Sequence, residues 1–515
     1  MINDLEIKKN RAVQASWLAI ANLLSLSTGM FISAVLSRFM TVTEYGTYRQ
    51  VFYVYSTLLI IFSMGIPKAY SYFLPRVPVE EGKDVVRKLS LLFLTFSSIF
   101  SIILFFGART IAELLNNPLL TNNLKYFAIT PMLLMPVMGV ENILTVYGMS
   151  RFVVIYIIIS RISMIVCTMF PVVALNTGTS GALIGFVVSS LVSCLVGLKL
   201  SSIPFRNVLS KKTDLAVKNI FRFSTPALIS SIYGFIISSS SQFFVSRYFG
   251  VEDFAMFANG YRELPFAGIV IGATAGVLQP EFSRMSKNGA DNVQFVTLWK
   301  NVIYKSSSVI YPISVFCCLF APEIVSLLYG SYYRETANLF RIVTIINLTR
   351  IVPYGPILFA LGKGWKFANA HLATALLLVG LDLLCVNLFP SLSAIAIIAA
   401  STTLFCLIIL MSTIAHLLKT PLMELMPWRK MSNILFVSVT TCSVARMIIY
   451  LTGMTHNLAV VSTGFTLYLS FYLFISFRSG INYIKIFDSL LSGTNINWLM
   501  GSKTKKQLIK YGKLK

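Results

Sequence analysis

The chain has 515 residues, of which 56% are hydrophobic and only 12% are charged, and its formal net charge is +24. A soluble globular domain carries roughly 25% charged residues, so this composition leaves too little polar surface for a water-facing protein and excludes a soluble enzyme. No stretch is long and polar enough to form a separate soluble domain, which favours a single membrane domain.

Apolar runs long enough to cross a bilayer recur from end to end of the chain. The first run follows Lys8, Lys9 and Arg11 and continues to about Met40 without a small-residue cleavage site, which predicts an uncleaved span rather than a secretory signal. The sequence predicts an all-α polytopic membrane protein of about fourteen transmembrane helices. The expected spans are 14–37, 50–74, 89–107, 126–148, 153–175, 181–200, 223–246, 258–281, 306–328, 337–360, 367–389, 391–416, 432–452 and 457–477.

The basic residues predict the orientation of these spans. With the N-terminus in the cytoplasm, about 31 of the 43 Lys and Arg fall on the cytoplasmic side, and about five fall in external loops. Positive charge concentrates on the side that is not translocated, so both termini are expected to be cytoplasmic. Topology and attraction to anionic lipid head groups explain most of the net charge, and we expect no nucleic-acid partner. The five external residues are Arg38, Arg109, Lys125, Arg247 and Arg334.

The two halves of the chain resemble each other. Ser37-Arg38-Phe39 matches Ser246-Arg247-Tyr248 at an offset of 209, and Tyr48-Arg49-Gln50 matches Tyr261-Arg262-Glu263 at an offset of 213. Six spans in each half give both halves the same orientation, which is the layout of a parallel-repeat transporter with a cavity between the halves. The expected units are an N-terminal six-helix bundle (1–210), a C-terminal six-helix bundle (211–420), two additional helices (421–480) and a basic cytoplasmic tail (481–515).

Small and polar residues follow one helix face in the first and seventh spans. Their spacings of three, four and four place each set on a single face. Such faces either let helices approach closely or line a wet cavity, and the sequence leaves both interpretations open. The aligned residues are Asn22, Ser25, Gly29 and Ser33 in the first span, and Ser231, Gly234, Ser238 and Gln242 in the seventh.

Several charged residues fall inside the expected spans. A charge at the bilayer centre costs at least ~2.5 kcal/mol, so such residues usually face a cavity or a partner. Arg49 and Arg262 occupy matching positions on the two sides of the inferred cavity, where they either line it or anchor the interface. Buried basic residues outnumber acidic ones about two to one, which favours an anionic substrate, because guanidinium forks suit phosphate oxygens.

The other candidate substrate-binding residues are Glu263, Lys68, Arg341 and Arg350. Snorkelling to the membrane surface is the alternative for Lys68 and Arg341, which lie near span ends. Arg350 precedes Pro353 and Pro356, whose freed backbone carbonyls are an alternative partner for it.

Two acidic residues are candidates for H⁺ or Na⁺ coupling: Glu141 in the fourth span and Asp382 in the eleventh. A protonated carboxyl that is hydrogen-bonded to a neighbour is the alternative for each. The seven cysteines and three histidines show no metal-ligand spacing. We therefore expect no metal, no disulfide framework and no cofactor.

Short motifs in a fixed order carry a resemblance that covers nearly the whole chain. With them, the sequence resembles the multidrug/oligosaccharidyl-lipid/polysaccharide (MOP) exporter superfamily, and within it the bacterial polysaccharide-repeat flippases of the O-antigen, capsule and teichoic type. The motifs run from Ser37 to Tyr48, Phe223 to Pro226, Ser246 to Gly250, Pro280 to Ser283, Ala321 to Ile324 and Leu361 to Lys363.

The resemblance implies a MATE-like fold of two six-helix bundles with two extra helices. It also implies flipping of undecaprenyl-pyrophosphate-linked oligosaccharide from the cytoplasmic to the outer face of the bacterial plasma membrane, by alternating access driven by an ion gradient. Arg49 and Arg262 are the residues carried over for binding the pyrophosphate and sugar acids. Expected partners are the lipid-linked oligosaccharide, membrane lipids, and the polymerase and chain-length proteins of the same pathway.

Two other functions stay open as alternatives. A cation-coupled drug exporter of the same fold predicts a carboxylate pocket in the first or seventh span, and the sequence has none there. A polysaccharide polymerase or ligase predicts a sizeable external loop with catalytic residues, whereas the longest expected external segment is 108–125. We therefore expect a transporter and no enzymatic activity.

Overall fold

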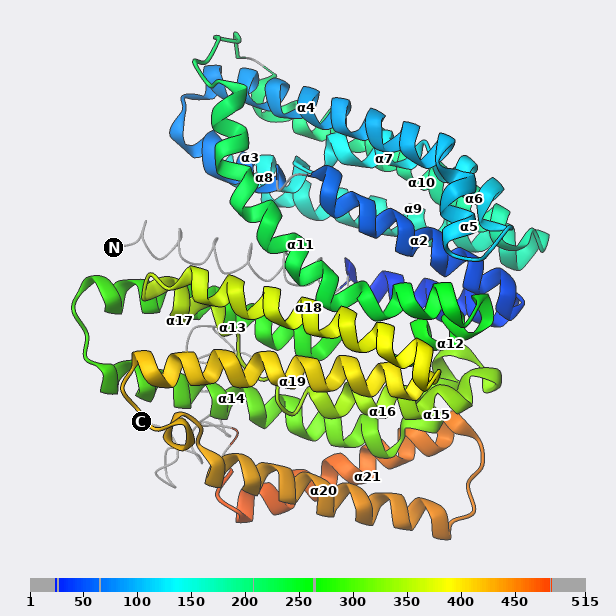
Figure 1. The fold of residues 1–515 in the computed structure, drawn as a ribbon, viewed down its shortest axis with the longest axis vertical. Coiled ribbons are helices and arrows are strands. Elements are labelled where there is room, and N and C mark those ends of the chain that lie inside the picture. Colours follow the sequence, from blue (N-terminus) through cyan, green and yellow to red (C-terminus); the bar gives the residue numbers. More distant parts are fainter. Residues whose placement is uncertain are drawn as a thin grey trace, which may run out of the picture.

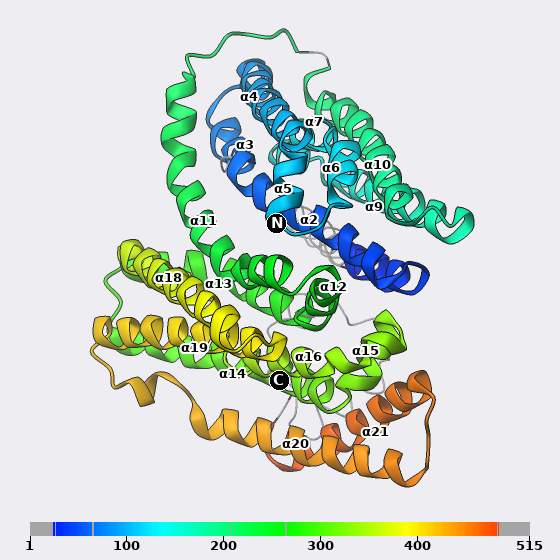
Figure 2. The same ribbon diagram turned by 45° about the vertical axis from the view of Figure 1, so that its right-hand side comes forward.

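The computed structural model describes residues 24–25, 27–63, 66–206, 208–262, 265–481 and 483. Every regular element within these ranges is a helix, so the all-α fold expected from the sequence is confirmed. Two bundles lie one above the other in Figure 1, and a pair of helices lies beneath the lower bundle. Figure 2 shows the same separation of the bundles from a second direction.

The upper bundle holds the N-terminal half of the chain. A helix over residues 27–39 comes first among its described elements. It is followed by α2 (Val42–Ser63), α3 (Pro67–Phe73), η1 (Leu74–Arg76), α4 (Val79–Phe106), α5 (Ala108–Leu114), α6 (Leu120–Phe127), α7 (Thr130–Leu134), η2 (Met135–Val137), α8 (Val140–Val146), α9 (Ser150–Leu175), α10 (Gly178–Ser201) and η3 (Ile203–Phe205).

The lower bundle holds the C-terminal half. It consists of α11 (Val217–Tyr248), α12 (Val251–Gly260), α13 (Pro265–Lys287), α14 (Asn292–Leu319), α15 (Ala321–Tyr329), η4 (Ser331–Thr336), α16 (Ala337–Ile346), α17 (Gly355–Ala360), α18 (Gly364–Leu388), α19 (Leu392–Leu417) and η5 (Leu422–Leu425).

The helix bounds repeat between the two bundles. α14 and α15 begin 213 residues after α4 and α5, and α18 and α19 begin 214 residues after α9 and α10. Gly148, before α9, and Gly362, before α18, have φ values of 71° and 69°, a conformation that glycine adopts without steric cost. The internal repeat of the sequence therefore corresponds to two copies of one chain path.

The last two described helices lie outside this repeat. α20 (Trp428–Leu451) packs along α14, and α21 (Asn457–Arg478) contacts α15. An ion pair of 2.8 Å between Arg446 Nη2 and Glu323 Oε1 joins α20 to α15. The pair of helices is therefore attached to one side of the lower bundle, away from the upper bundle (Figure 1).

Within the described ranges, nine segments are long and apolar enough to cross a membrane, so the chain is a multi-pass membrane protein. The expected total of fourteen stays a prediction. The expected span at 14–37 lies largely outside the described residues, and the one at 337–360 is not continuous, because residues 347–354 between α16 and α17 are non-helical. Pro353 lies near the end of this stretch and disfavours helical backbone at the residue before it, Val352.

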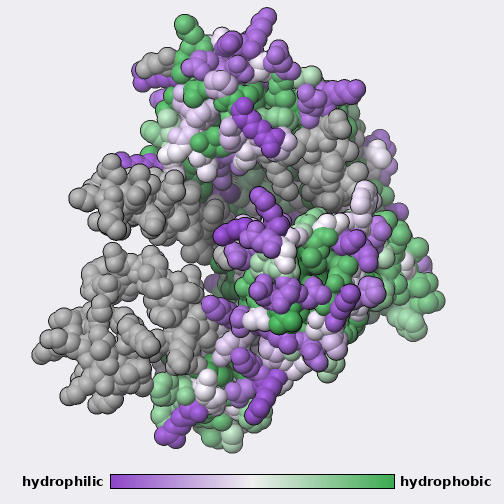
Figure 3. Space-filling model, turned by 90° about the vertical axis from the view of Figure 1, so that its left-hand side faces the viewer, coloured by the Kyte–Doolittle hydropathy of each residue, from purple (hydrophilic) through white to green (hydrophobic). Residues whose placement is uncertain are grey.

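The loops gather at two opposite ends of the molecule. The left-hand end in Figure 1 carries the beginnings of α4, α11 and α18 and the ends of α10, α13 and α19, and it holds the segments expected to be cytoplasmic. The opposite end carries α5, α15 and the connection between α20 and α21. Figure 3 looks onto the first of these ends and shows hydrophilic residues over both bundles.

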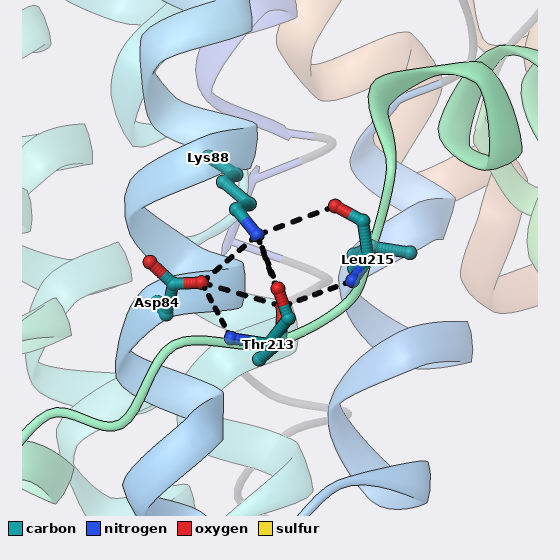
Figure 4. Close-up of polar contacts among 4 residues, drawn as sticks. All are labelled: Asp84, Lys88, Thr213 and Leu215. Carbon is teal, nitrogen blue, oxygen red and sulfur yellow. Dashed lines mark hydrogen bonds and ion pairs between the residues drawn. The ribbon is translucent and has the colours of Figure 1, made fainter.

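The chain that links the two bundles is fixed to α4. Asp84 Oδ2 accepts hydrogen bonds from the Thr213 amide at 2.9 Å and the Thr213 hydroxyl at 3.3 Å. Lys88 Nζ donates to the carbonyl of Thr213 at 2.8 Å and to that of Leu215 at 3.3 Å, and it pairs with Asp84 at 3.0 Å (Figure 4). The linker therefore leaves the upper bundle along a defined path before α11 begins.

Candidate substrate cavity

A cavity of about 700 Å³ lies chiefly within the lower bundle and reaches the interface with the upper bundle. Its walls come from α11, α12, α13, α18 and α19 and from the stretch between α16 and α17. Among its described lining residues, Arg49 of α2 is the only contribution of the upper bundle, and none is Asp or Glu. The polar lining residues are Arg49, Ser238, Gln242, Tyr261, Arg262, Arg350, Tyr354, His371 and Thr403.

Arg49 and Arg262 meet at one hydroxyl group. Nη1 of Arg49 lies 3.4 Å from the Ser33 Oγ, and Nη1 of Arg262 lies 3.0 Å from the same atom. The Ser33 hydroxyl donates its own proton to the Gly29 carbonyl at 2.8 Å, which leaves its lone pairs to accept from the two guanidinium groups. The two cations are therefore brought together, from opposite halves of the chain, at the edge of the cavity.

The guanidinium group of Arg49 has N–H donors in addition to the one that contacts Ser33. Arg49 Nη2 donates to the Ala258 carbonyl at 3.3 Å, and its buried Nε has no hydrogen-bond partner among the described residues. Two guanidinium groups beside each other repel, and the repulsion is stronger in a cavity of low dielectric than in water. An anion bound between them would relieve the repulsion and accept the remaining N–H groups.

The helix register refines the predicted equivalence of the two arginines. α2 begins at Val42 and α12 at Val251, an offset of 209 at which Ala258, not Arg262, corresponds to Arg49. Arg262 comes after α12 has ended at Gly260. The chain path between α12 and α13 thus brings Arg262 to Ser33 from a position about one helical turn beyond the strict repeat.

The small polar faces predicted in the first and seventh spans are related to this cavity in different ways. Gly234, Ser238 and Gln242 of α11 line it. Ser33 contacts both arginines, and Gly29 lies beside Arg262. The face of the seventh span therefore lines the cavity, and the face of the first span contacts two arginines of its lining. Asn22 lies outside the described residues, and so does the side chain of Ser231.

Arg350 and His371 line the same cavity. Arg350 lies in the non-helical stretch before Pro353. His371 of α18 makes a hydrogen bond of 2.9 Å between its Nδ1 and the Phe367 carbonyl. The spacing of the three histidines speaks only against a metal site and gives His371 no other role. Its position as an ionisable residue within an expected span is the signal that could have pointed to the cavity.

The remaining candidates for substrate binding lie elsewhere. Arg341 Nε donates to the Cys318 carbonyl at 3.3 Å and its Nη1 to Asn338 Oδ1 at 2.9 Å, so this guanidinium is held at the end of α14 and does not line the cavity. Lys68 belongs to α3, and its side chain lies outside the described residues, as does the whole of Glu263.

The two candidates for ion coupling are not among the lining residues of the cavity. Asp382 of α18 is fully buried against α11, where its Oδ2 accepts from the hydroxyls of Ser240 at 3.3 Å and Ser241 at 3.0 Å. Its Oδ1 is buried with no hydrogen-bond partner among the described residues. Glu141 of α8 lies near Arg161, whose Nε donates to the Ser25 hydroxyl at 3.0 Å.

At the end opposite to that of Figure 3, the bundles are joined by reciprocal contacts. Arg38 of the upper bundle donates to the Leu327 carbonyl in the last turn of α15, and Arg247 of the lower bundle donates to the Glu113 carbonyl in the last turn of α5 at 2.8 Å. The last carbonyls of a helix lack intrahelical partners, and cations are favourable there. The two arginines are repeat equivalents, so the contacts follow the symmetry of the halves.

Buried polar contacts between α2 and the lower bundle lie beside these arginines. The Tyr45 hydroxyl donates to Asn259 Oδ1 at 2.7 Å, and Gln50 Nε2 donates to the Ser246 hydroxyl at 2.8 Å. All four residues are buried. The two bundles are therefore in direct contact at the end that the sequence predicts to be external.

Comparison with known proteins identifies the family and the fold. Residues 35–338 match the family model described as "Polysaccharide biosynthesis protein". The structure is similar to that of the lipid II flippase MurJ in an inward closed conformation, with a TM-score of 0.64 and 16% identity over 90% of this chain and 99% of that chain. No curated protein matches the sequence.

Two other solved structures share the fold. One is an inward-facing multidrug resistance MATE family transporter of the MOP superfamily, with a TM-score of 0.62 and 15% identity over 78% of this chain and 96% of that chain. The other is a MOP superfamily transporter from Pyrococcus furiosus whose binding pocket is described as having reverse polarity, with a TM-score of 0.53 and 16% identity over 80% of this chain and 97% of that chain. The MATE-like fold expected from the sequence is confirmed.

Proposed function

Because the chain belongs to the polysaccharide biosynthesis protein family, we propose that it moves a lipid-linked oligosaccharide across the plasma membrane for the synthesis of a surface polysaccharide. The proposed cargo is an undecaprenyl-pyrophosphate-linked repeat unit of the O-antigen, capsule or teichoic type. It travels from the cytoplasmic to the outer face by alternating access. In this proposal the protein is a transporter and breaks no covalent bond.

The observation that carries the proposal is the pair of guanidinium groups at Ser33. Arg49 and Arg262 present N–H donors at a cavity whose described lining includes Arg350 and no carboxylate. A pyrophosphate supplies the charge and the acceptor oxygens that two guanidinium forks require. The polar residues of α11, such as Ser238 and Gln242, provide hydrogen-bonding groups for the sugars beside the pyrophosphate.

The size of the cavity fits a polar head group better than a whole lipid. A volume of about 700 Å³ is within the range of pockets for small ligands. The long undecaprenyl chain would stay in the bilayer while the pyrophosphate and the first sugars occupy the cavity. This arrangement leaves only the polar part of the cargo to be shielded from the hydrocarbon.

The contacts of Arg38 and Arg247 supply the proposed outer gate. With both in place, the bundles are closed at the end predicted to be external, which corresponds to a state that receives cargo from the cytoplasm. Opening of that end requires both guanidinium groups to leave the helix carbonyls that they now contact. The repeat symmetry makes the two contacts break together when one bundle rocks against the other.

We propose Asp382 as the residue that couples transport to an H⁺ or Na⁺ gradient. This carboxylate is fully buried, with two hydroxyl donors and one oxygen that has no partner among the described residues, and either cation would occupy such a group. Asp382 lies between α11 and α18, and both helices also line the cavity. Glu141 is the second candidate, with Arg161 as its neighbouring charge.

The alternative function, a cation-coupled multidrug exporter of the same fold, has one observation against it. A pocket for cationic drugs requires carboxylates, and the described lining of this cavity holds Arg49, Arg262 and Arg350 instead. The MATE transporters that share the fold are under 25% identical to this chain, so their cargo does not transfer to it.

The proposal includes a location and partners. The protein lies in the bacterial inner membrane with both termini in the cytoplasm, as the distribution of basic residues predicts. The polymerase and chain-length proteins of the same pathway would take up the flipped repeat unit at the outer face.

Deletion of the gene tests the proposed function. The expected result is a lipid-linked repeat unit that accumulates on the inner leaflet and is transferred outward again when the wild-type gene is restored. Loss of surface polysaccharide with no lipid-linked intermediate would place the protein at an earlier or later step. Unchanged polysaccharide together with increased drug sensitivity would favour the multidrug exporter.

A further inference from the structure

A second cavity of about 700 Å³ lies in the upper bundle, and it shares no residue with the substrate cavity. The beginning of α4 and the end of α10, together with η3, form its walls. Four cationic side chains line it, and none of the described lining residues is acidic. They are Lys83 and Arg87 of α4, Lys199 of α10 and Arg206 after η3.

The helix geometry explains why these charges converge. Lys83 and Arg87 are four residues apart and share one face of α4. Asp84, the acidic residue between them, is turned toward the linker and is occupied by Lys88 and Thr213 (Figure 4). Among the described residues, Arg87 therefore has no carboxylate that compensates its charge.

The other two cations have equally little compensation. Lys199 and Arg206 form no ion pair within the described part of the chain and are exposed. Lys83 Nζ donates to the Val208 carbonyl at 3.4 Å, at the start of the linker. Four like charges around one hollow repel one another, and an anion bound among them would offset that repulsion.

The apolar residues next to the hollow indicate which kind of anion fits there. Leu91 follows Arg87 by one turn of α4, and Leu195 precedes Lys199 by one turn of α10; these leucines are 52% and 61% exposed. Both helices are apolar enough to cross a membrane. The cationic hollow thus lies at the edge of the lipid-facing surface, on the end of the molecule that Figure 3 shows.

We propose that this hollow binds the phosphate head group of an anionic membrane phospholipid, with the acyl chains along the exposed leucines of α4 and α10. Basic pockets between transmembrane helices at the cytoplasmic surface favour anionic head groups in this way. Free inorganic phosphate shares the chemistry of the head group, but it gains nothing from the apolar surface beside the hollow. A bound lipid would also contact Arg206, where the linker between the bundles begins.

Native mass spectrometry of the full-length protein in detergent tests this site. The probes are phosphatidylglycerol, zwitterionic phosphatidylcholine of the same chain length, and inorganic phosphate as a competitor. The test variant combines Arg87→Gln with Lys199→Gln. Its matched control combines Lys211→Gln with Lys212→Gln, which removes the same charge from exposed residues at the same end of the molecule that do not line the hollow.

Each cation near a lipid surface contributes about 1 kcal/mol, or roughly fivefold in affinity. The test variant should therefore bind phosphatidylglycerol about 25-fold more weakly than the wild type, while the control variant stays within about twofold. Phosphatidylcholine should bind weakly to all three proteins, and millimolar phosphate should not displace phosphatidylglycerol.

Three results would overturn the proposal. An equal loss in the control variant would show a general charge effect, and equal binding of both lipids would show a purely apolar contact. Displacement by millimolar phosphate would show that a free anion is the ligand. If the test variant does not fold, Arg206→Gln replaces it with Lys212→Gln as its control. The expected loss is then about fivefold, and no loss would contradict the site.

Discussion

Arg49 and Arg262, which come from opposite halves of the chain, both donate to the hydroxyl of Ser33. Two cations that share one neutral acceptor leave a local excess of positive charge beside the substrate cavity. The contact also spans the interface between the bundles, so it changes when the bundles move. In the proposed mechanism, substrate binding and alternating access therefore meet at these three side chains.

Replacement of Ser33 by Ala should weaken this arrangement. The substitution removes the acceptor that holds both guanidinium groups, and a buried polar group that loses its partner costs about 1–3 kcal/mol. We expect slower appearance of the lipid-linked repeat unit at the outer leaflet, measured in cells that lack the wild-type gene. Ser37→Ala is the matched control, because Ser37 lies one turn further along the same helix and donates only to the Ala34 carbonyl among the contacts described. Equal effects of the two substitutions would count against the proposed role of Ser33.

Loss of the two contacts at the outer end should favour a state open to the outside. Arg38→Ala combined with Arg247→Ala removes both guanidinium groups from the carbonyls of Leu327 and Glu113. A cysteine placed at Ser238, within the cavity, should then react several times faster with a membrane-impermeant thiol reagent added outside. The same protein without this cysteine gives the background from the native thiols.

The control for the outer gate is Arg109→Ala, because Arg109 is exposed and pairs with Glu113 of its own helix. This variant should leave the reaction rate of the introduced cysteine unchanged. If Arg38→Ala with Arg247→Ala produced no faster labelling than Arg109→Ala, the two contacts would not restrain the outer end.

Asp382→Asn should uncouple transport from the ion gradient. The substitution keeps the shape of the side chain and can still bond to Ser240 and Ser241, but it removes the charge that would bind H⁺ or Na⁺. In proteoliposomes, the wild-type rate should rise when the driving ion gradient is imposed, whereas the variant rate should stay constant. Glu141→Gln tests the second candidate in the same assay. A variant at Asp382 that responded to the gradient as the wild type does would exclude it as the coupling site.

The ion pair between Arg446 and Glu323 should stabilise the attachment of α20. Glu323 is buried, so Arg446→Met leaves an uncompensated carboxylate, which costs about 3–5 kcal/mol. We expect a lower unfolding temperature of the purified protein in detergent. Adding Glu323→Gln to Arg446→Met should restore much of the loss, because the buried charge is then gone. No rescue by the double substitution would show that packing of Arg446 on Phe320, and not its charge, stabilises the helix pair.

Periodic features of the sequence predicted most of the fold. Apolar runs and the offset between the halves identified the helices and their repeat, because each half must bury the same faces in the same order. The break between α16 and α17 is not evident from the sequence, where the apolar run over 337–360 continues through Pro353. A proline in an apolar run is compatible with either a kinked or an interrupted helix, and packing around the cavity decides between them.

Only part of the cavity could be predicted from the sequence. Arg49 and Arg262 were recognised because a charge within a membrane span requires a partner. His371 was missed because its place in the cavity depends on how α18 packs against α19 and the stretch before α17. The contact of Arg262 with Ser33 also depends on the chain path after Gly260, which no spacing in the sequence specifies.

Arg49 and Arg262 are proposed to bind the pyrophosphate. The most direct test is the rate at which a variant with both arginines replaced transports the lipid-linked repeat unit. Arg49→Ala with Arg262→Ala removes both forks, and Arg151→Ala with Arg429→Ala removes two exposed guanidinium groups outside the cavity. A hydrogen bond to a charged group contributes about 1.5–3 kcal/mol, or roughly tenfold or more in rate for each arginine. We predict that the first variant transfers the repeat unit at least about 100-fold more slowly and accumulates it on the inner leaflet, while the second matches the wild type. An undiminished transfer rate in a well-expressed Arg49→Ala, Arg262→Ala variant would contradict the account.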